Sequence, residues 1–444
     1  MHAKIYEIKS KLTEFVKYDI PLLQFPIVLL LSAQIVFLSR RKKILGSIEL
    51  ASKVHRSGWW GSEKTILNIV QNILFRGKNA IKNRELFIEQ LVDSLEPKPN
   101  TTKFFNNPEL LFDGVCLFLK SYQNGQKGVL LIKYSYYFPL LFKFYDMKAM
   151  SERYHIVLEP SWAGTCEPGI LAYSTLDAPV FIMAYEARDT KFLNDLKTNL
   201  KPVPLSSNWW VDHRNFKPAI ESKKDIDIIV ISSWTYFKRH YRIFDALRKL
   251  KQSNPRLKVA LVGYSVDMTL EDIKALASYY NVDDLLEYHE KIPPSEVGAL
   301  LKRSKINLLW SRFEGLNRSI IEGMFSDVPC IIRKGFNYGM KYPYINEKTG
   351  IWSEEKALAS NIKSMLKNYH NYTPREYVMR HHTCFIATQL LTDTINAFCT
   401  NENERIDKLA VKVNLLDCMT YFDASQNDTF KHDIDNTRSM RLPI

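Results

Sequence analysis

The chain has 444 residues, of which 46% are apolar and 25% are charged. This length and composition exclude a disordered or fibrous protein and suffice for two domains with separate cores. The net charge of +13 predicts an anionic partner, and nucleic acid, an anionic membrane surface and a nucleotide diphosphate all fit that description.

The first distinctive stretch is apolar. Residues 20–39 carry no charge, and four basic residues follow at 40–43. Twenty such residues are long enough to cross a bilayer, but two prolines and two glutamines interrupt the run, and no small-residue cleavage site marks it as a signal peptide. A helix buried in protein or lying on the membrane fits better than a span. We expect peripheral association with an anionic membrane surface on the cytoplasmic side.

Strand and helix patterns alternate through a first domain, which we place at 43–215. Apolar residues at helical spacing predict a helix from Ile66 to Leu74, and a second helix is expected at 85–95. Strands are predicted at 44–48, 115–119, 129–134, 155–158 and 180–184. Strands that alternate with helices favour a parallel sheet covered on both faces.

A charged connector, residues 214–224, separates this domain from a second one at 216–375. Five strands, each followed by a helix or loop, give the second domain a Rossmann-like pattern. They are predicted at 226–231, 259–262, 285–288, 307–310 and 328–332. Helices follow at 358–366 and 377–398, and the remaining segments are 1–42, as an apolar and basic N-terminal segment, and 376–444, as a C-terminal helix with a loosely ordered tail.

Two glutamates mark the most informative stretch, residues 306–333. Glu314 lies in the loop after a predicted strand, and Glu322 lies eight residues later, two turns into the next helix. In an open α/β sheet, ligands bind beyond the carboxyl ends of the strands, facing the first amides of the following helix. We therefore expect Glu314 at the mouth of a cleft. Spacing alone would equally allow a surface helix with two solvated carboxylates; the order of the surrounding elements favours the site.

This motif resembles that of the retaining nucleotide-sugar glycosyltransferases of family 4, which have the GT-B fold. In that family a small residue or two, a proline and a buried strand follow the helix, as in SDVPCII here, except that Asp327 stands where glycine is usual. The resemblance extends over residues 225–350, with a weaker echo at 43–212. It implies an α/β protein with two Rossmann-like domains whose parallel sheets face each other across a cleft.

The resemblance also implies roles for individual residues on the donor side. Lys238 matches the phosphate-binding lysine of the family, although its usual arginine companion, five residues earlier, is Ser233 here. Glu314 matches the glutamate that contacts the donor sugar beside the reacting centre, and Glu322 the one that accepts the ribose hydroxyls. We therefore take Glu314 and Lys238 as catalytic. The expected donor-binding residues are Glu322, Leu316, Asn317, Arg318, Ser233 and Gly263.

Within that set, the start of the helix is expected to meet the diphosphate. The backbone amides of Leu316 and Asn317 would face it, although the family usually has glycine at the position of Asn317. Arg318 is expected to replace the cation missing at Ser233, because a guanidinium can fork two phosphate oxygens. The alternative is a solvated arginine on an exposed helix face.

The first domain offers three acceptor-side candidates. Gly61 begins a run that resembles the N-terminal glycine-rich loop of the family, with an ordinary strand-to-helix turn as the alternative. Tyr185 and Glu186 stand where many members have a histidine that contacts the donor sugar. We assign all three residues to the acceptor side.

No metal and no other cofactor are expected. The triplet Asp225, Ile226, Asp227 spells a metal-diphosphate motif of another glycosyltransferase fold, but it opens a strand, and ligands gather at the opposite end. The six cysteines form no CxxC pair or metal-type spacing and are expected as buried thiols in a reducing compartment.

The sequence therefore predicts a retaining, hexosyltransferase-like glycosyltransferase. It would move a sugar from a nucleotide-sugar donor to a glycan or lipid-linked acceptor in cell-surface polysaccharide or glycolipid synthesis. One alternative is a catalytically inactive GT-B scaffold that binds a glycan or protein partner. A nucleic-acid partner, suggested by the net charge, is not expected because no recognised motif occurs in the basic segments.

Overall fold

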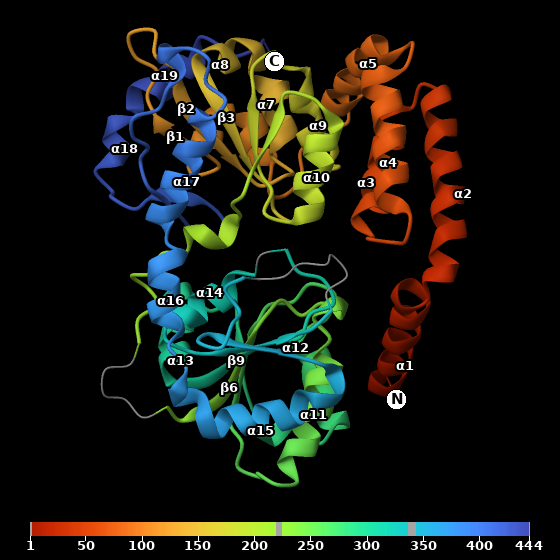
Figure 1. Cartoon of the computed structure of the whole chain (residues 1–444), viewed down its shortest axis with the longest axis vertical. Helices are drawn as coiled ribbons and strands as arrows, with labels where there is room; N and C mark the ends of the chain where they lie inside the picture. Colours follow the sequence, from red (N-terminus) through yellow and green to blue (C-terminus); the bar gives the residue numbers. More distant parts are fainter. Residues whose placement is uncertain (1, 219–223, 316, 336–342, 444) are drawn as a thin grey trace. The chain divides into compact units, whose positions relative to one another are not determined.

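The chain folds into two compact units (Figure 1). The six-stranded unit comprises Met1–Asp19 and Val211–Thr383, and the five-stranded unit comprises Ile20–Trp210 and Cys384–Ile444. This computed structural model describes residues 2–218, 224–315, 317–335 and 343–443. Each unit has its own α/β core, so the two Rossmann-like domains of the expected fold class are confirmed.

The units divide the chain differently from the expected domains. Residues 1–42 are not one segment, because the first nineteen belong to the six-stranded unit and helix α2 (Pro21–Arg40) belongs to the other. The single helix expected at 377–398 is two helices, α16 (Pro374–His381) and α17 (Cys384–Asn396). His382 lies between them, buried and with φ −148° and ψ 47°, outside the helical region. The chain changes units after the next residue, Thr383.

The six-stranded sheet is wholly parallel. Its spatial order is β8–β7–β6–β9–β10–β11, which in chain order reads 3-2-1-4-5-6, the doubly wound arrangement. Its strands are β6 (Ile226–Ile231), β7 (Val259–Gly263), β8 (Leu286–Glu290), β9 (Ser304–Leu309), β10 (Cys330–Arg333) and β11 (Gly350–Ser353). The first five were predicted, and β11 was missed in an aromatic and glycine-rich run. The order reverses between β6 and β9, so that is where a ligand site is favoured.

Amphipathic helices cover this sheet. In α11, Ile243, Leu247 and Leu250 are buried, and in α15 Leu358 and Ile362 are buried; the two helices lie side by side in Figure 1. The helices are α11 (His240–Lys251), α12 (Leu270–Tyr279), α13 (Pro294–Arg303), α14 (Arg318–Phe325), α15 (Leu358–Asn368) and α16. The N-terminal helix α1 (His2–Glu14) and a π-helical turn, Phe15–Asp19, belong to the same unit.

The five-stranded sheet has the order β1–β2–β3–β4–β5, without a reversal. Its strands are β1 (Cys116–Lys120), β2 (Gly128–Lys133), β3 (Tyr154–Glu159), β4 (Val180–Met183) and β5 (Leu200–Val203). The prediction of an entirely parallel sheet is wrong for β1, which pairs antiparallel with β2. The connection between them, residues 121–127, is too short for a parallel crossover. Strand β5 was not predicted.

Helices, not strands, begin this unit. They are α2, α3 (Ile44–Arg56), α4 (Ser62–Gln71) and α5 (Ala80–Asp93), and α2 runs alongside α3 and α4 in Figure 1. The strand predicted at 44–48 is wrong: Ile44, Ile48 and Ala51 are buried at helical spacing on α3. Five residues span little more than one helical turn, so the pattern was ambiguous. By length and composition, α2 would suffice to cross a membrane.

The remaining elements complete the five-stranded unit. They are α6 (Thr102–Asn106), α7 (Phe138–Phe144), α8 (Met147–Arg153), α9 (Pro168–Leu171), α10 (Ala187–Leu196), β12 (Lys412–Asn414), β13 (Met419–Tyr421), α18 (Gln426–Thr429) and α19 (Lys431–Arg438). The tail expected to be loosely ordered contains α19. Its buried Asp433 accepts hydrogen bonds from the Tyr154 hydroxyl at 2.8 Å and the Tyr122 amide at 3.0 Å. These bonds tie a polar helix to β3.

Candidate active site at the switch point

Two loops meet where the strand order of the six-stranded sheet reverses. One, residues 232–239, follows β6, and the other, residues 310–317, follows β9. The amide of Arg312 donates a hydrogen bond of 2.7 Å to the carbonyl of Phe237, so the loops are joined through their backbones. The doubly wound order therefore brings together residues that lie more than seventy positions apart in the chain.

Each loop contributes one member of a buried ion pair. Lys238 pairs with Glu314, and both residues are 8% exposed. The Ser311 hydroxyl donates a second hydrogen bond to Glu314, at 2.5 Å. Opposite charges attract more strongly where little water screens them. The structure thus joins the two residues that the sequence predicted as catalytic.

Trp234 determines the shape of the first loop. It is fully buried, and its amide donates to the carbonyl of Tyr264 at 2.9 Å. A Cβ atom on Gly263 would lie 2.4 Å from Trp234 Nε1 and 2.4 Å from the Ser232 carbonyl oxygen. Gly263 therefore makes room for Trp234. Ser233 is half-buried, and its carbonyl accepts a hydrogen bond from the Thr235 amide at 3.0 Å. Donor-binding roles for Gly263 and Ser233 stay predictions.

Helix α14 carries the second glutamate. Burial raises the pKa of Glu322, and the charge of Arg318 opposes that rise. The Arg318 guanidinium lies 3.5 Å from Glu322 Oε1, one helical turn away. Asn317 is the N-cap residue, and its Oδ1 accepts a hydrogen bond from the Ser319 hydroxyl at 2.5 Å instead of capping the helix amides. Leu316 lies outside the described residues.

Close packing holds α14 against β9. Asn307 Nδ2 donates to the carbonyl of Ser319 at 2.7 Å, and a Cβ atom on Gly323 would lie 2.5 Å from that same nitrogen. After the helix, Asp327 has φ +58°, in the left-handed region that favours glycine. This explains in physical terms why the corresponding position in the resembled family is usually glycine.

Comparison with known families assigns this part of the chain. Residues 212–379 match the family described as Glycosyl transferases group 1. The matched region covers less than half of the chain. It contains all six parallel strands, both loops and helix α14. No curated protein matches the chain in sequence.

Solved structures of similar fold include several glycosyltransferases. A mutant of S. aureus TarM in complex with fondaparinux, alpha-GlcNAc-glycerol and UDP is 14% identical, with a TM-score of 0.44, over 60% of this chain and 55% of TarM. Sucrose-phosphate synthase from Thermosynechococcus elongatus is 14% identical, with a TM-score of 0.45, over 61% of this chain and 74% of the synthase chain. Anabaena HepE in complex with UDP is 13% identical, with a TM-score of 0.47, over 60% of this chain and 79% of the HepE chain. The match thus spans about half the length of TarM.

Further charged residues of the six-stranded unit surround the two loops. Arg239, which directly follows Lys238, is 2% exposed and pairs with Glu14 and Glu355. Arg312, two residues before Glu314, pairs with Asp19 at 2.5 Å. The position of Arg312 in the motif loop was a signal that sequence reasoning overlooked. No pattern could have predicted Glu14, which lies 225 positions from its partner.

A cavity of about 370 Å³ opens beside the same loops. Aromatic and cationic side chains dominate its lining: Lys9, Lys17, Tyr18, Tyr236, Phe237 and Phe313. Arg312 and Glu14 also reach it. The N-terminal helix and its following turn therefore form one wall of a cavity in the six-stranded unit.

The three acceptor-side candidates lie in the five-stranded unit. Gly61 has φ +83° and precedes α4; a Cβ atom there would approach the Phe25 ring to 2.8 Å. Tyr185 and Glu186 follow β4, and the Tyr185 ring lies 6.4 Å from that of Trp209. Glu186 is 4% exposed, and burial together with the nearby Asp189 raises its pKa to about 8. Their acceptor-side role stays a prediction.

The acidic triplet lies at the amino end of β6, and its cationic partners lie near the amino end of β9. Asp225 pairs with Arg303 at 2.8 Å, and Asp227 pairs with Lys305 at 2.6 Å. Across the described ranges, no three His, Cys, Asp or Glu side chains come together as metal ligands. The carboxylates of the triplet therefore serve as partners for neighbouring cations, at the end of the sheet opposite residues 232–239 and 310–315.

Proposed function

We propose that the protein moves a sugar from a nucleotide-diphosphate sugar to a glycan or lipid-linked acceptor, with retention of anomeric configuration. The observation that carries this proposal is the pairing of Lys238 with Glu314 at the switch point, within the region that matches Glycosyl transferases group 1. A hexose is the expected sugar, and the expected role is in cell-surface polysaccharide or glycolipid synthesis. The neighbouring structures whose names include UDP support a nucleotide diphosphate as the leaving group.

The chemistry of sugar transfer suits the two paired residues. Negative charge gathers on the departing diphosphate, while positive charge grows at the anomeric carbon. The Lys238 ammonium has three donors, so it can contact Glu314 and a phosphate oxygen together. Glu314 supplies a carboxylate beside the sugar. Because both groups are buried, they need little reorganisation during the reaction.

Helix α14 supplies the proposed nucleotide contacts. Glu322 would accept the ribose hydroxyls, since the two oxygens of a carboxylate match two adjacent donors. Arg318 reaches Glu322 Oε1 at 3.5 Å, and its guanidinium has five donors, enough to serve a phosphate oxygen as well. Arg318 would then supply the cation that Ser233 lacks. An Arg318→Ala variant with unchanged donor kinetics would overturn that role.

The test is nucleotide release by the purified full-length chain from UDP-glucose, UDP-N-acetylglucosamine and GDP-mannose. We expect release from at least one donor, with EDTA having no effect because no metal is proposed. Glu322→Ala should mainly raise the donor KM, and Glu314→Ala should mainly lower kcat. NMR of the product anomer then tests retention. Nucleotide binding without release from any donor would favour the inactive scaffold.

We further propose that the protein lies on the inner face of a membrane through α2. Gln24, Val28, Ser32 and Ile35 bury one face of this helix within the five-stranded unit. Its other side chains present exposed apolar surface, formed by Leu22, Leu23, Phe25, Ile27, Leu29, Leu30 and Phe37. The exposed basic run 40–43 follows, which suits anionic lipid headgroups.

Vesicle flotation tests this location. The protein should float with vesicles that contain phosphatidylserine or phosphatidylglycerol, and high salt or alkaline carbonate should release it. Replacing Arg40, Arg41, Lys42 and Lys43 with glutamine should abolish binding. Retention in carbonate, with release only by detergent, would mean that α2 crosses the bilayer instead.

A further inference from the structure

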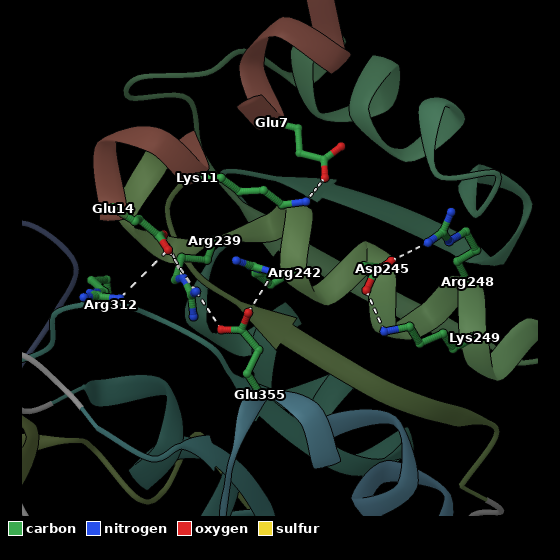
Figure 2. Close-up of polar contacts among 10 residues, drawn as sticks. All are labelled: Glu7, Lys11, Glu14, Arg239, Arg242, Asp245, Arg248, Lys249, Arg312 and Glu355. Carbon is green, nitrogen blue, oxygen red and sulfur yellow. Dashed lines mark hydrogen bonds and ion pairs between the residues drawn. The ribbon is translucent and has the colours of Figure 1, made fainter. Parts of the chain in front are cut away.

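We propose that Glu14, on the N-terminal helix α1, is a positioning residue for the Lys238–Glu314 pair. This inference rests on the proposed function. Glu14 lies between the two arginines next to that pair in sequence: Arg239 follows Lys238 directly, and Arg312 precedes Glu314 by two residues (Figure 2). A helix outside the family match would thereby hold both catalytic loops.

The contacts of Glu14 are specific in geometry. Arg239 Nε donates to one carboxylate oxygen at 2.8 Å, and an Arg239 terminal nitrogen donates to the other at 2.9 Å. This two-pronged arrangement fixes the orientation of the guanidinium plane. Arg312 lies on the other side of the carboxylate, 4.0 Å from Oε2. Glu14 thus connects the loop after β6 with the loop after β9.

The backbone at Arg239 explains why an anchor is needed there. Arg239 has φ 58° and ψ 42°, the left-handed conformation that is sterically unfavourable for a residue with a Cβ atom. This bend ends the 3₁₀ turn of Tyr236–Lys238 and starts α11, so it sets the direction in which Lys238 leaves the loop. The buried ion pair with Glu14 offsets that cost.

Charge balance gives Glu14 a second effect. Arg239, Arg242, Arg312 and Arg333 crowd around the loops, and burial together with the charges of Arg239 and Arg312 lowers the pKa of Arg333 to about 10. Glu355 accepts from Arg239 at 2.7 Å and pairs with Arg242 at 2.8 Å. Without the charge of Glu14, Arg239 and Arg312 would compete with Lys238 for Glu314.

Other contacts dock α1 independently of Glu14. The Tyr6 ring stacks on Tyr236 with centroids 5.3 Å apart, and Tyr18 meets Phe313 edge-on at 4.8 Å. Each of these partners belongs to one of the catalytic loops. A neutral substitution at residue 14 should therefore leave the helix in place while releasing the arginines. That separation makes a positioning role testable.

The experiment compares Glu14→Gln with Glu7→Gln in the full-length chain. Glu7 lies on the same helix but pairs with Lys11 and touches neither arginine, so it is the matched control (Figure 2). We expect Glu14→Gln to lower kcat for donor cleavage by about 10- to 100-fold. Its donor KM should stay within about threefold of the wild type, since ground-state binding is largely kept. Glu7→Gln should match the wild type in both constants.

Two further variants distinguish the effect of the position of the Glu14 carboxylate from the effect of its charge. Glu14→Asp keeps the charge on a shorter arm and should recover part of kcat. Glu14→Gln combined with Arg312→Gln should lose less than the product of the single losses, because the unbalanced cation is removed as well. A Glu14→Gln kcat equal to that of Glu7→Gln, or strictly multiplicative losses in the double variant, would overturn the proposal.

Hydrogen exchange provides a readout that does not need activity. Amides of residues 232–239 and 310–315 should exchange faster in Glu14→Gln than in Glu7→Gln, while those of α13 should not change. If the wild type neither binds UDP or GDP nor cleaves any donor, the proposed function fails, and the exchange data still decide whether Glu14 holds the loops. Equal protection of both loops in the two variants would refute the positioning role.

Discussion

A buried lysine–glutamate pair lies at the carboxyl ends of strands in each unit, yet the two pairs differ in their surroundings. In the five-stranded unit, Glu159 ends β3 and pairs with Lys412 of β12 at 2.5 Å. In the six-stranded unit, Glu314 follows β9 and pairs with Lys238. Both pairs join segments distant in sequence. Their environments separate a structural tie from a candidate catalytic pair.

The Glu159 pair is enclosed by further polar groups. Asn414 donates to Glu159 at 2.8 Å and accepts from Lys412 at 2.8 Å, and Lys133 lies 4.0 Å from Glu159. Burial pushes the pKa of Glu159 upward, but the charges of Lys412 and Lys133 outweigh it and hold the pKa below its usual value. The side chains of Lys412 and Glu159 are 0% and 1% exposed, which leaves no room for a substrate.

The Glu314 pair is built from loops instead. Glu314 pairs with Lys238 and accepts a hydrogen bond from the Ser311 hydroxyl, and both residues lie on segments that follow strands at the switch point. The five-stranded sheet has no such reversal of strand order. A lysine–glutamate pair is therefore informative about function only together with its place in the topology.

The largest effect is expected from Lys412→Met. It leaves Lys133, at 4.0 Å, as the cation beside the buried Glu159 and should lower the free energy of unfolding by about 3–5 kcal/mol. Urea unfolding followed by tryptophan fluorescence measures this loss, since Lys412 lies 4.5 Å from the Trp210 ring. Donor kinetics of the fraction that remains folded should be unchanged. If Lys412→Met lost catalysis without losing stability, the Lys412–Glu159 pair would be functional and not structural.

Lys238→Met should show the opposite pattern. We expect kcat/KM for donor cleavage to fall by about 10²- to 10³-fold, equivalent to about 2.7–4 kcal/mol of transition-state stabilisation. Stability should change less than in Lys412→Met, because Glu314 lies in a loop and keeps its hydrogen bond from the Ser311 hydroxyl. Steady-state nucleotide release and urea unfolding of both variants provide the test. Equal destabilisation with normal kinetics would make this pair structural as well.

Sequence reasoning succeeded where local patterns were long and regular. The strands β6, β7, β8, β9 and β10 were predicted, and the motif placed Glu314 and Glu322 correctly on a loop and a helix. The contact between Lys238 and Glu314 was not predicted, although the doubly wound order explains it, since that order brings the ends of the first and fourth strands together.

The sequence analysis missed contacts between residues distant in sequence and misassigned segments whose patterns are too short or too polar. Glu14 contacts Arg239 across 225 positions, and no periodicity encodes such a pair. The apolar residues of 44–48 fit a strand as well as one turn of α3. Helix α19 has a polar sequence, and only the tertiary contacts of Asp433 explain its order.

Glu186 extends the comparison to a buried carboxylate without a lysine partner. Burial and Asp189 raise its pKa from 4.5 to about 8, against the opposing charge of Arg188. A raised pKa favours the folded state below pH 4.5, and that advantage is lost as the pH rises to about 8. Glu186→Gln should therefore match the wild type near pH 4.5 and become progressively more stable than it towards pH 8.

Thermal unfolding of both proteins across this range measures the difference. Asp189→Asn provides a second test. Removing that neighbouring charge should lower the pKa of Glu186 and narrow the pH range over which the stability changes. Parallel stability curves for Glu186→Gln and the wild type would show that Glu186 ionises normally in the folded protein.

The smallest effect is expected at the amino ends of β6 and β9, away from the Lys238–Glu314 pair. Lys305 and Asp227 form a partly exposed pair at 2.6 Å, on the amino-terminal residues of β9 and β6. Lys305→Met should cost about 1 kcal/mol or less, because water already screens the pair. Asp227→Asn should leave donor kinetics unchanged with or without added Mg²⁺, since substrates bind beyond the other end of the sheet. Nucleotide release at matched ionic strength provides the measurement. A Mg²⁺-dependent loss of activity in Asp227→Asn would contradict this prediction. It would mean that the acidic triplet holds a metal ion and that substrate binds at the amino ends of the strands.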